Sequence, residues 1–359
     1  MSSLIVEVVR IGEVEAHPNA DRLEMVTVKG WNCVVGKGQF KTGDLAIYVP
    51  IDAVLPAWMI DKYELEYLKK GERVRTVRLR GSISQGLLLT PPEGAFREGE
   101  NVAERLGITK WEPPVQTFTR GPSVGKPNRL RPNPNFSRYT DIENVKNFPS
   151  VFKPGDPVVV TEKIHGTNFR CGWVERPTKD LWNRLKAWLF GEYEWVVGSH
   201  NVQLTLTTPK HAKFYGGNVY HEIAHRYNLK ILLRQGEIIY GEIYGDKIQD
   251  LAYGKKNGDI DVVFFDLKRG DRYLNWADFK DVCENRDLPM APVLYEGEYK
   301  DGLLAEYTDG PSVLAAGKHM REGVVVKDQW ERMDKTIGRK VLKSVSTDYL
   351  LRKDGTEFH

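Results

Sequence analysis

The chain has 359 residues, of which 41% are hydrophobic and 28% are charged, an ordinary composition for a soluble globular protein. This length predicts two domains, each large enough to bury a core of its own. The formal net charge of +3 permits nucleic acid as a partner but does not identify one, so such binding would need a local basic surface.

Three cysteines, Cys33, Cys171 and Cys283, lie far apart and form no CxxC pair or His–Cys cluster. This spacing gives no indication of zinc and predicts reduced thiols in a cytosolic protein. The first ten residues lack the pattern of a signal peptide. No apolar stretch approaches the roughly 18 residues that a membrane span requires. We therefore expect a cytoplasmic protein with no membrane partner. We also expect a monomer.

Residues 1–105 contain short apolar runs separated by glycine-containing turns. Many short strands with close turns predict a small β-barrel. The expected strands are Leu4–Ile11, Leu23–Val28, Asn32–Val35, Asp44–Val49, Val74–Leu79 and Gly86–Thr90.

A basic run follows within this first domain, and we expect it to bind nucleic acid. It comprises Lys69, Lys70, Arg73, Arg75, Arg78 and Arg80. Two readings stay open: a charged edge strand that is merely solvated, or a groove that contacts phosphates. The two arginine pairs differ in strand parity, so a bulge would be needed to place all four on one face.

Residues 106–138 are rich in proline and arginine and are expected to form an extended basic linker. The second domain is expected over residues 139–359, opening with a short helix at 139–144 capped by Thr140 or Asp141. Its pattern predicts an α+β fold with a mainly antiparallel sheet. Expected strands are Val158–Thr161, Glu194–Gly198, Glu237–Ile243, Val262–Leu267, Gly323–Lys327 and Lys340–Val345. Expected helices are Lys210–Tyr227 and Asn275–Arg286.

The most informative motif is Lys163-Ile-His-Gly166, which directly follows a β-branched run. A strand end can fix a lysine amine there, and a glycine next to it lets the backbone approach a phosphate closely. A lysine attacks phosphorus only after losing a proton, which neighbouring cations, a metal and partial burial all favour. The alternative is a surface lysine at a strand end.

Two parts of the sequence resemble known protein families. The segments His17–Leu23, Gly36–Asp44 and Ala46–Pro50 resemble the tRNA-binding type of OB-fold, with a plain β-barrel as the alternative. The second domain resembles covalent nucleotidyltransferases, and specifically ATP-dependent RNA ligases of the nick-sealing type with an N-terminal OB domain. Six segments follow the motif order of that family: Lys163–Asn168, Ser199–Asn201, Ile238–Ile243, Val262–Asp266, Arg321–Lys327 and Gly338–Ser346.

The resemblance implies an OB-fold domain followed by an α+β nucleotidyltransferase (ATP-grasp-like ligase) domain. It implies that Lys163 takes AMP from ATP, that Glu162 reaches the adenine amino group, and that Asn168 contacts ribose or phosphate. Ile164, His165 and Gly166 belong to the same ATP-binding turn. DNA ligases and capping enzymes usually have aspartate where this chain has His165, which favours RNA ligation.

Further roles follow from the resemblance. Ser199 is expected to contact ribose or phosphate, although a plain turn is nearly as good an interpretation. Glu242 is expected to meet a ribose hydroxyl or a metal-bound water, the alternative being a buried basic partner. Phe265 is expected to stack on adenine while Phe264 belongs to the core, although both could belong to the core.

The last two motifs supply charged groups. Glu322, with Glu242, is expected to bind Mg²⁺ or Mn²⁺. Lys327 is expected to point at the phosphates or at the adenine side of the pocket. The family places two lysines at alternate positions of its final strand; Lys343 fits the second, and Lys340 is the nearest substitute for the first, which falls on Val341.

The expected reaction joins RNA 3′-hydroxyl and 5′-phosphate ends through lysyl-AMP and an AMP-capped 5′ end. The expected substrate is a nicked duplex or RNA/DNA hybrid in RNA repair. The alternatives are a DNA ligase or a GTP-dependent capping enzyme, which His165, Glu162 and the domain order disfavour, and a noncatalytic OB-fold protein that binds nucleic acid.

Overall fold

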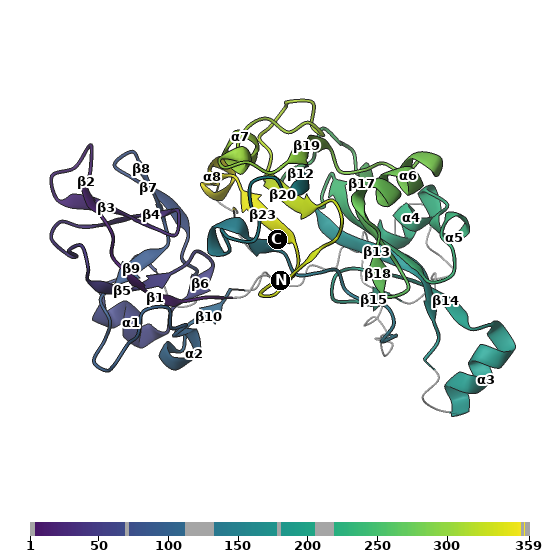
Figure 1. The fold of residues 1–359 in the computed structure, drawn as a ribbon, viewed down its shortest axis with the longest axis horizontal. Coiled ribbons are helices and arrows are strands. Elements are labelled where there is room, and N and C mark those ends of the chain that lie inside the picture. Colours follow the sequence, from purple (N-terminus) through teal and green to yellow (C-terminus); the bar gives the residue numbers. More distant parts are fainter. Residues whose placement is uncertain are drawn as a thin grey trace. The chain divides into compact units, whose positions relative to one another are not determined.

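The computed structural model describes residues 4–68, 72–111, 133–177, 181–204, 219–352 and 355. The chain divides into two compact units. The first comprises Met1–Pro114, Ile142–Ser150 and Lys343–His359, and the second comprises Val115–Asp141 and Val151–Leu342. Figure 1 shows the elements of both units. Most of the expected linker, and the expected contacts of Lys69 and Lys70, lie outside the described residues.

The first unit is built from short antiparallel ladders, and all six strands expected there are confirmed. Its ladders follow the orders β1-β5-β9, β2-β3-β4, β10-β6 and β7-β8. Apolar side chains of β1, β5 and β9 pack on helix α1 around Val8, Ile47, Leu89 and Met59. Bounds are β1 Glu7–Arg10, β2 Val14–Ala16, β3 Leu23–Val28, β4 Trp31–Gly36, β5 Leu45–Val49, β6 Ala53–Val54, α1 Ala57–Lys62, β7 Thr76–Leu79, β8 Ser82–Gln85, β9 Leu87–Leu89, α2 Ala103–Leu106, β10 Thr109–Lys110 and α8 Thr347–Leu350.

The prediction of a short helix at residues 139–144 is wrong. Strand β11 (Glu143–Asn144) and a 3₁₀ turn, η1 (Val145–Asn147), occupy this region. The Asn144 side chain caps the turn by accepting a hydrogen bond from the Lys146 N–H. The cap therefore lies three or four residues later than the sequence indicated, because an asparagine oxygen caps as well as threonine or aspartate does.

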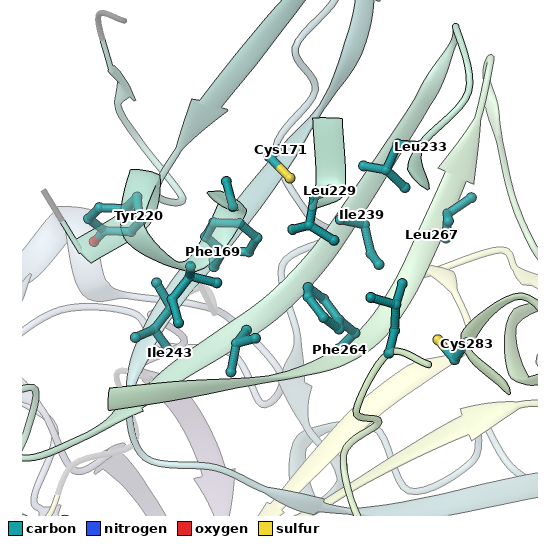
Figure 2. Close-up of a cluster of buried hydrophobic side chains, with 14 of the residues drawn as sticks. Phe169, Cys171, Tyr220, Leu229, Leu233, Ile239, Ile243, Phe264, Leu267 and Cys283 are labelled. Atoms are coloured by element: carbon teal, nitrogen blue, oxygen red, sulfur yellow. The ribbon is translucent and has the colours of Figure 1, made fainter. Parts of the chain in front are cut away.

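A six-stranded sheet of order β15-β14-β13-β16-β17-β18 dominates the second unit. Neighbouring strands are antiparallel, as expected. Alternate residues of β13, β16 and β17 point into a buried cluster with helices α4, α5 and α6 (Figure 2). The cluster includes Phe169, Ile239, Ile243 and Phe264. The opposite face of these strands is therefore left for polar side chains.

Strand β12 lies between β19 and β20 in a second antiparallel sheet of this unit. Bounds in the unit are β12 Pro157–Lys163, β13 Thr167–Glu175, α3 Leu181–Phe190, β14 Tyr193–Gly198, β15 Gln203–Leu204, α4 Val219–Arg226, α5 Leu229–Leu232, β16 Glu237–Gly245, β17 Ile260–Arg269, β18 Arg272–Tyr273, α6 Trp276–Asn285, β19 Val293–Glu298, α7 Leu303–Thr308, β20 Gly323–Asp328, β21 Met333–Asp334 and β22 Gly338–Arg339. Strand β23, Val341–Val345, crosses the boundary between the units.

The second unit confirms the expected strands, although several elements were missed. Helix α6 begins after Asn275, whose side chain accepts the N–H of Asp278, as an N-cap should. Helix α4 overlaps the end of the expected helix Lys210–Tyr227, whose first part lies outside the described residues. Strands β13 and β19 and helices α3 and α7 were not expected. No helix among the described residues is long and apolar enough to span a membrane.

Candidate active site

The strand pairing of the second unit brings Lys163 to Glu322. Lys163 is the last residue of β12 and pairs with Gly323, the first residue of β20. Glu322 immediately precedes β20, and its Oε1 lies 2.7 Å from Lys163 Nζ. Two charged residues that are 159 positions apart thus meet at one end of two adjacent strands.

Glu322 is fully buried, and only one of its oxygens is paired within the described structure. Oε1 accepts the hydrogen bond from Lys163, whereas Oε2 has no hydrogen-bond partner. The His165 ring approaches this atom, with Nδ1 3.8 Å from Oε2. A buried carboxylate oxygen without a partner is costly, so this atom is a natural ligand for a cation or a bound donor.

Glu242 lies on β16 beside the same pair of charges. Burial raises the pKa of its carboxyl to about 8, Lys163 lowers the pKa, and the negative charge of Glu322 raises it. A hydrogen bond from the Gly166 backbone also lowers the pKa. At neutral pH Glu242 is therefore mostly protonated, and a cation bound beside it would favour loss of that proton.

The raised pKa of Glu242 predicts how the stability of the folded chain changes with pH. Its pKa is about 8 in the folded chain and about 4.3 in an unfolded chain. Because the folded state binds this proton more tightly, stability falls as the pH rises from about 4.3 to about 8, and then levels off. Glu242→Gln removes this loss, so without divalent cations its thermal stability should gain on the wild type between pH 5 and pH 8.5. The expected difference is on the order of a few kcal/mol; parallel stability curves for the two proteins would contradict it.

The turn after Lys163 requires glycine. A Cβ on Gly166 would lie 2.1 Å from the carbonyl oxygen of Ile243, so the turn and β16 approach too closely for any side chain. Ile164 and His165 are buried next to it. The position expected to admit a phosphate is thus packed tightly against the strand that carries Glu242.

Glu162 is buried, and its two oxygens differ in their partners. Oε2 accepts the backbone N–H groups of Val313 and Leu314, at 2.8 and 3.3 Å. Oε1 has no hydrogen-bond partner among the described residues. One oxygen therefore fixes the side chain, and the other can accept a hydrogen bond from an amine.

The face of the large sheet opposite the core carries further predicted residues. Asn168 on β13 pairs with Glu242 on β16, and its buried Oδ1 has no partner among the described residues. A bulge in β17 leaves Phe265 outside the core cluster, whereas Phe264 belongs to it. The Phe265 ring meets the Tyr139 ring edge-on, with centroids 4.9 Å apart. The prediction that only one of the two phenylalanines enters the core agrees with this arrangement.

Ser199 lies directly after β14, where its N–H donates to the carbonyl oxygen of Val202. Its own carbonyl accepts the Arg170 guanidinium at 2.9 Å. These contacts form a tight turn at the end of the sheet. The sequence had left such a plain turn open as the alternative to a ribose or phosphate contact.

One lysine, Lys340, differs from the sequence prediction. Lys340 Nζ lies 2.6 Å from Asp156, which precedes the start of β12, whereas Lys163 ends this seven-residue strand. At about 3.3 Å per residue the two lysines are some 20 Å apart, so Lys340 is not part of the site around Lys163. Lys327 pairs with Val159, and its Nζ lies 3.4 Å from both Asp266 and Glu331. Its ammonium thus lies between two acids without a hydrogen bond to either. Asp266 directly follows Phe265, so a place for Lys327 on the adenine side of the pocket stays a prediction. Lys343 is buried on β23, in the part of the chain that belongs to the first unit.

The arginines of the basic run in the first unit are either buried or exposed. Arg73 is buried, forms an ion pair with Asp52 and donates to the Gly355 carbonyl. It cannot contact a partner at the surface, and this corrects the expectation of four available arginines. Arg75, Arg78 and Arg80 are exposed on or beside the β7–β8 hairpin.

The sequence missed the loop between β16 and β17, which contacts the turn after Lys163 through Gln249, Asp250 and Tyr253. No motif marks these residues. Their only signal in the sequence is their position shortly after Glu242, and their contacts become visible only in the fold.

Comparison with known proteins then gives the family. Residues 156–345 match the RNA ligase family model, which is more than half of the chain. The chain belongs to the RNA ligase family. Residues 5–91 match an OB-fold domain model, so the predicted combination of an N-terminal OB fold and a mainly antiparallel ligase domain is confirmed. A comparison with curated protein sequences finds no match.

Solved structures of Naegleria gruberi RNA ligase are similar over nearly the whole of this RNA ligase. A mutant described as apo has 27% identity and a TM-score of 0.74, covering 98% of each chain. A mutant with ATP and Mn has the same identity and TM-score, covering 96% of this chain and 98% of its own. The enzyme with PPi again has 27% identity and a TM-score of 0.74, covering 97% and 98%.

Proposed function

We propose that this RNA ligase uses ATP to adenylylate Lys163 and then joins RNA 5′-phosphate and 3′-hydroxyl ends. The observation that carries the proposal is the buried Lys163–Glu322 pair at 2.7 Å, in a turn that accepts only glycine at position 166. Structures of the N. gruberi enzyme with ATP and Mn, with AMP and Mn, and with PPi support it.

Three displacements at phosphorus would follow. Lys163 Nζ attacks the α-phosphorus of ATP, a nitrogen–phosphorus bond forms, and pyrophosphate leaves with the electrons of the broken bond. A 5′-phosphate oxygen then takes the AMP from Nζ. Finally, the 3′-hydroxyl oxygen attacks the capped 5′-phosphate, and AMP leaves. Such transfers depend mainly on positioning and on neutralising charge, which fits a lysine fixed at a strand end.

The carboxylates fit Mg²⁺ or Mn²⁺. Glu322 Oε2 lacks a hydrogen-bond partner, and the pKa of Glu242 is raised by burial and by Glu322. No group of three or more His, Cys, Asp and Glu residues in the described chain is gathered to hold a metal alone. An ion that takes most ligands from water and phosphate suits such a site. When bound, it would neutralise charge on the phosphates.

The buried acid beside Lys163 supports the choice of ATP. Glu162 Oε1 is a fixed acceptor, which suits the exocyclic amine of adenine and opposes the carbonyl of guanine. Phe265, outside the core, supplies the aromatic face proposed to stack on the base.

Labelled nucleotide tests the proposal directly. The wild-type chain should form a covalent adduct with α-labelled ATP and not with GTP. It should then seal a panel of nicked duplex RNA and RNA/DNA hybrid substrates in preference to nicked DNA. An adduct with GTP would indicate a capping-type enzyme, preference for nicked DNA would indicate a DNA ligase, and no adduct would indicate a noncatalytic protein.

We further propose that the OB-fold unit contacts RNA phosphates through the exposed Arg75, Arg78 and Arg80. Replacing all three with glutamine should weaken nick binding and lower the salt dependence of binding by roughly one unit of slope for each arginine. Lysine adenylylation should be unchanged. Replacing the exposed Lys41 and Arg97 with glutamine serves as the control, and equal effects of the two variants would contradict the assignment.

The remaining features of the proposal follow the family resemblance. We propose repair of RNA nicks by a monomer in the cytoplasm. The three cysteines are free and buried, which supports a reducing compartment.

A further inference from the structure

The loop between β16 and β17 contacts two consecutive residues of the catalytic turn at three points. Gln249 Nε2 donates to the Gly166 carbonyl at 3.3 Å. The His165 backbone N–H donates to the Tyr253 hydroxyl at 2.7 Å. The His165 ring Nε2 lies 2.8 Å from Asp250 Oδ1. The loop thus fixes both the backbone and the side chain of the turn that begins at Lys163.

Tyr253 adopts a costly backbone conformation to make its contact. Its φ is 51°, in the left-handed region, which a bulky aromatic residue adopts only at a cost in strain. The ring is buried, with its neighbours Tyr244 and His319 packed edge-on at centroid distances of 5.3 and 4.7 Å. Strain that persists at this point indicates a role for the hydroxyl, which is the part that reaches the turn.

Asp250 fixes the orientation of the His165 ring. An ionised carboxylate can only accept hydrogen bonds, so Nε2 carries the hydrogen between them. The ring plane is then set, and Nδ1 is directed toward the Glu322 side, 3.8 Å from Oε2. His165 is buried, and its ring packs beside the carboxylate that holds Lys163 without a hydrogen bond to it.

We infer that Asp250 and Tyr253 are positioning residues for lysine adenylylation, acting through His165. They hold the turn so that Lys163 Nζ and the Glu322 carboxylate keep their places while the α-phosphate is attacked. This inference rests on the proposed function, because it assigns the two residues to the same first step.

Single-turnover adenylylation at varied ATP concentration tests the inference. Asp250→Ala and Tyr253→Phe should each lower the maximal rate by about tenfold or more, since small misplacements of reacting groups are costly. The apparent KM for ATP should stay near the wild-type value, because neither residue is assigned a contact with ATP. Asp250→Asn should keep most of the rate, because its amide oxygen still accepts a hydrogen bond from Nε2.

Tyr244→Phe is the matched control, since it removes a hydroxyl from a neighbouring buried tyrosine without touching the turn. It should adenylylate like the wild type, and thermal unfolding should show all variants folded. In a His165→Ala background, Asp250→Ala should cost no more than about twofold, because the residues act in series.

The outcomes separate the two hypotheses. A wild-type chain that forms no adduct overturns the proposed function itself. If the wild type reacts, two results overturn the role of the loop. One is a folded Asp250→Ala or Tyr253→Phe variant with a normal rate, and the other is an Asp250→Ala effect of undiminished size without His165.

Discussion

Replacing Lys163 with alanine is expected to abolish the covalent adduct with ATP. No other lysine among the described residues of the second unit takes its place beside Glu322: Lys327 lies between Asp266 and Glu331, and Lys340 pairs with Asp156. Without an amine at the end of β12 there is no nucleophile for the α-phosphorus. The adduct should be measured with α-labelled ATP on denaturing gels, where a nitrogen–phosphorus bond survives base and is cleaved by acid.

A second substrate separates chemistry from folding in this variant. RNA that already carries AMP on its 5′ end needs no lysine adduct, so Lys163→Ala should still bind it and retain part of the joining activity. Lys340→Ala is the control for loss of a lysine, because its ammonium pairs with Asp156 away from the turn, and it should still form an adduct. A labelled Lys163→Ala protein would falsify the assignment of the nucleophile.

The sequence predicted the strand end and the glycine turn after Lys163 because their requirements are local. A β-branched strand, a lysine and an obligatory glycine are adjacent in the chain, and the close approach of Ile243 to Gly166 shows why the glycine is needed. The Lys163–Glu322 pairing was also within reach, because both residues stand at strand ends in motifs of known order. The pairing itself depends on the antiparallel register of β12 and β20.

The predictions for Lys340 and Arg73 failed because each side chain pairs with an acid that the sequence did not indicate. Lys340 is one residue from the expected position of the first lysine, and a shift of one residue turns a side chain to the other face of a strand. Arg73 looked like its exposed neighbours, but the buried Asp52 pairs with it. No property of either residue type could reveal these partners.

Strand β13 was missed because its polar residues interrupt the apolar pattern. Arg170 is buried within it, and its charge is accommodated by the carbonyl groups of Phe136 and Ser199 and by the Phe136 ring. The loop that carries Asp250 and Tyr253 has no sequence motif, because its contacts join segments that are distant in the chain. The first compact unit includes Ile142–Ser150 and Lys343–His359, which lie beyond the expected boundary at residue 139, so a fragment starting at residue 139 would split that unit.

Replacing Glu322 with alanine is expected to be the second most damaging change. This acid is fully buried, holds Lys163 at 2.7 Å and has one oxygen free of hydrogen bonds in the described structure. Loss of the carboxylate removes the orientation of the nucleophile and the proposed metal ligand together. We expect adenylylation to fall by far more than tenfold, where each tenfold corresponds to about 1.4 kcal/mol of barrier.

The same substitution also removes one partner of a buried ion pair, so its effect on stability must be measured separately. Leaving a buried charge without its partner costs on the order of 3–5 kcal/mol. Glu237→Ala is the matched control: Glu237 is equally buried, and it pairs with Arg269 and Arg286 away from the turn. Both variants should unfold at lower denaturant, but only Glu322→Ala should lose adenylylation per folded molecule. Raising Mg²⁺ or Mn²⁺ should not restore its rate, since the missing group is the ligand itself. If folded Glu322→Ala adenylylates Lys163 as fast as Glu237→Ala does, the acid serves only the fold, and the lysine must be oriented by another group.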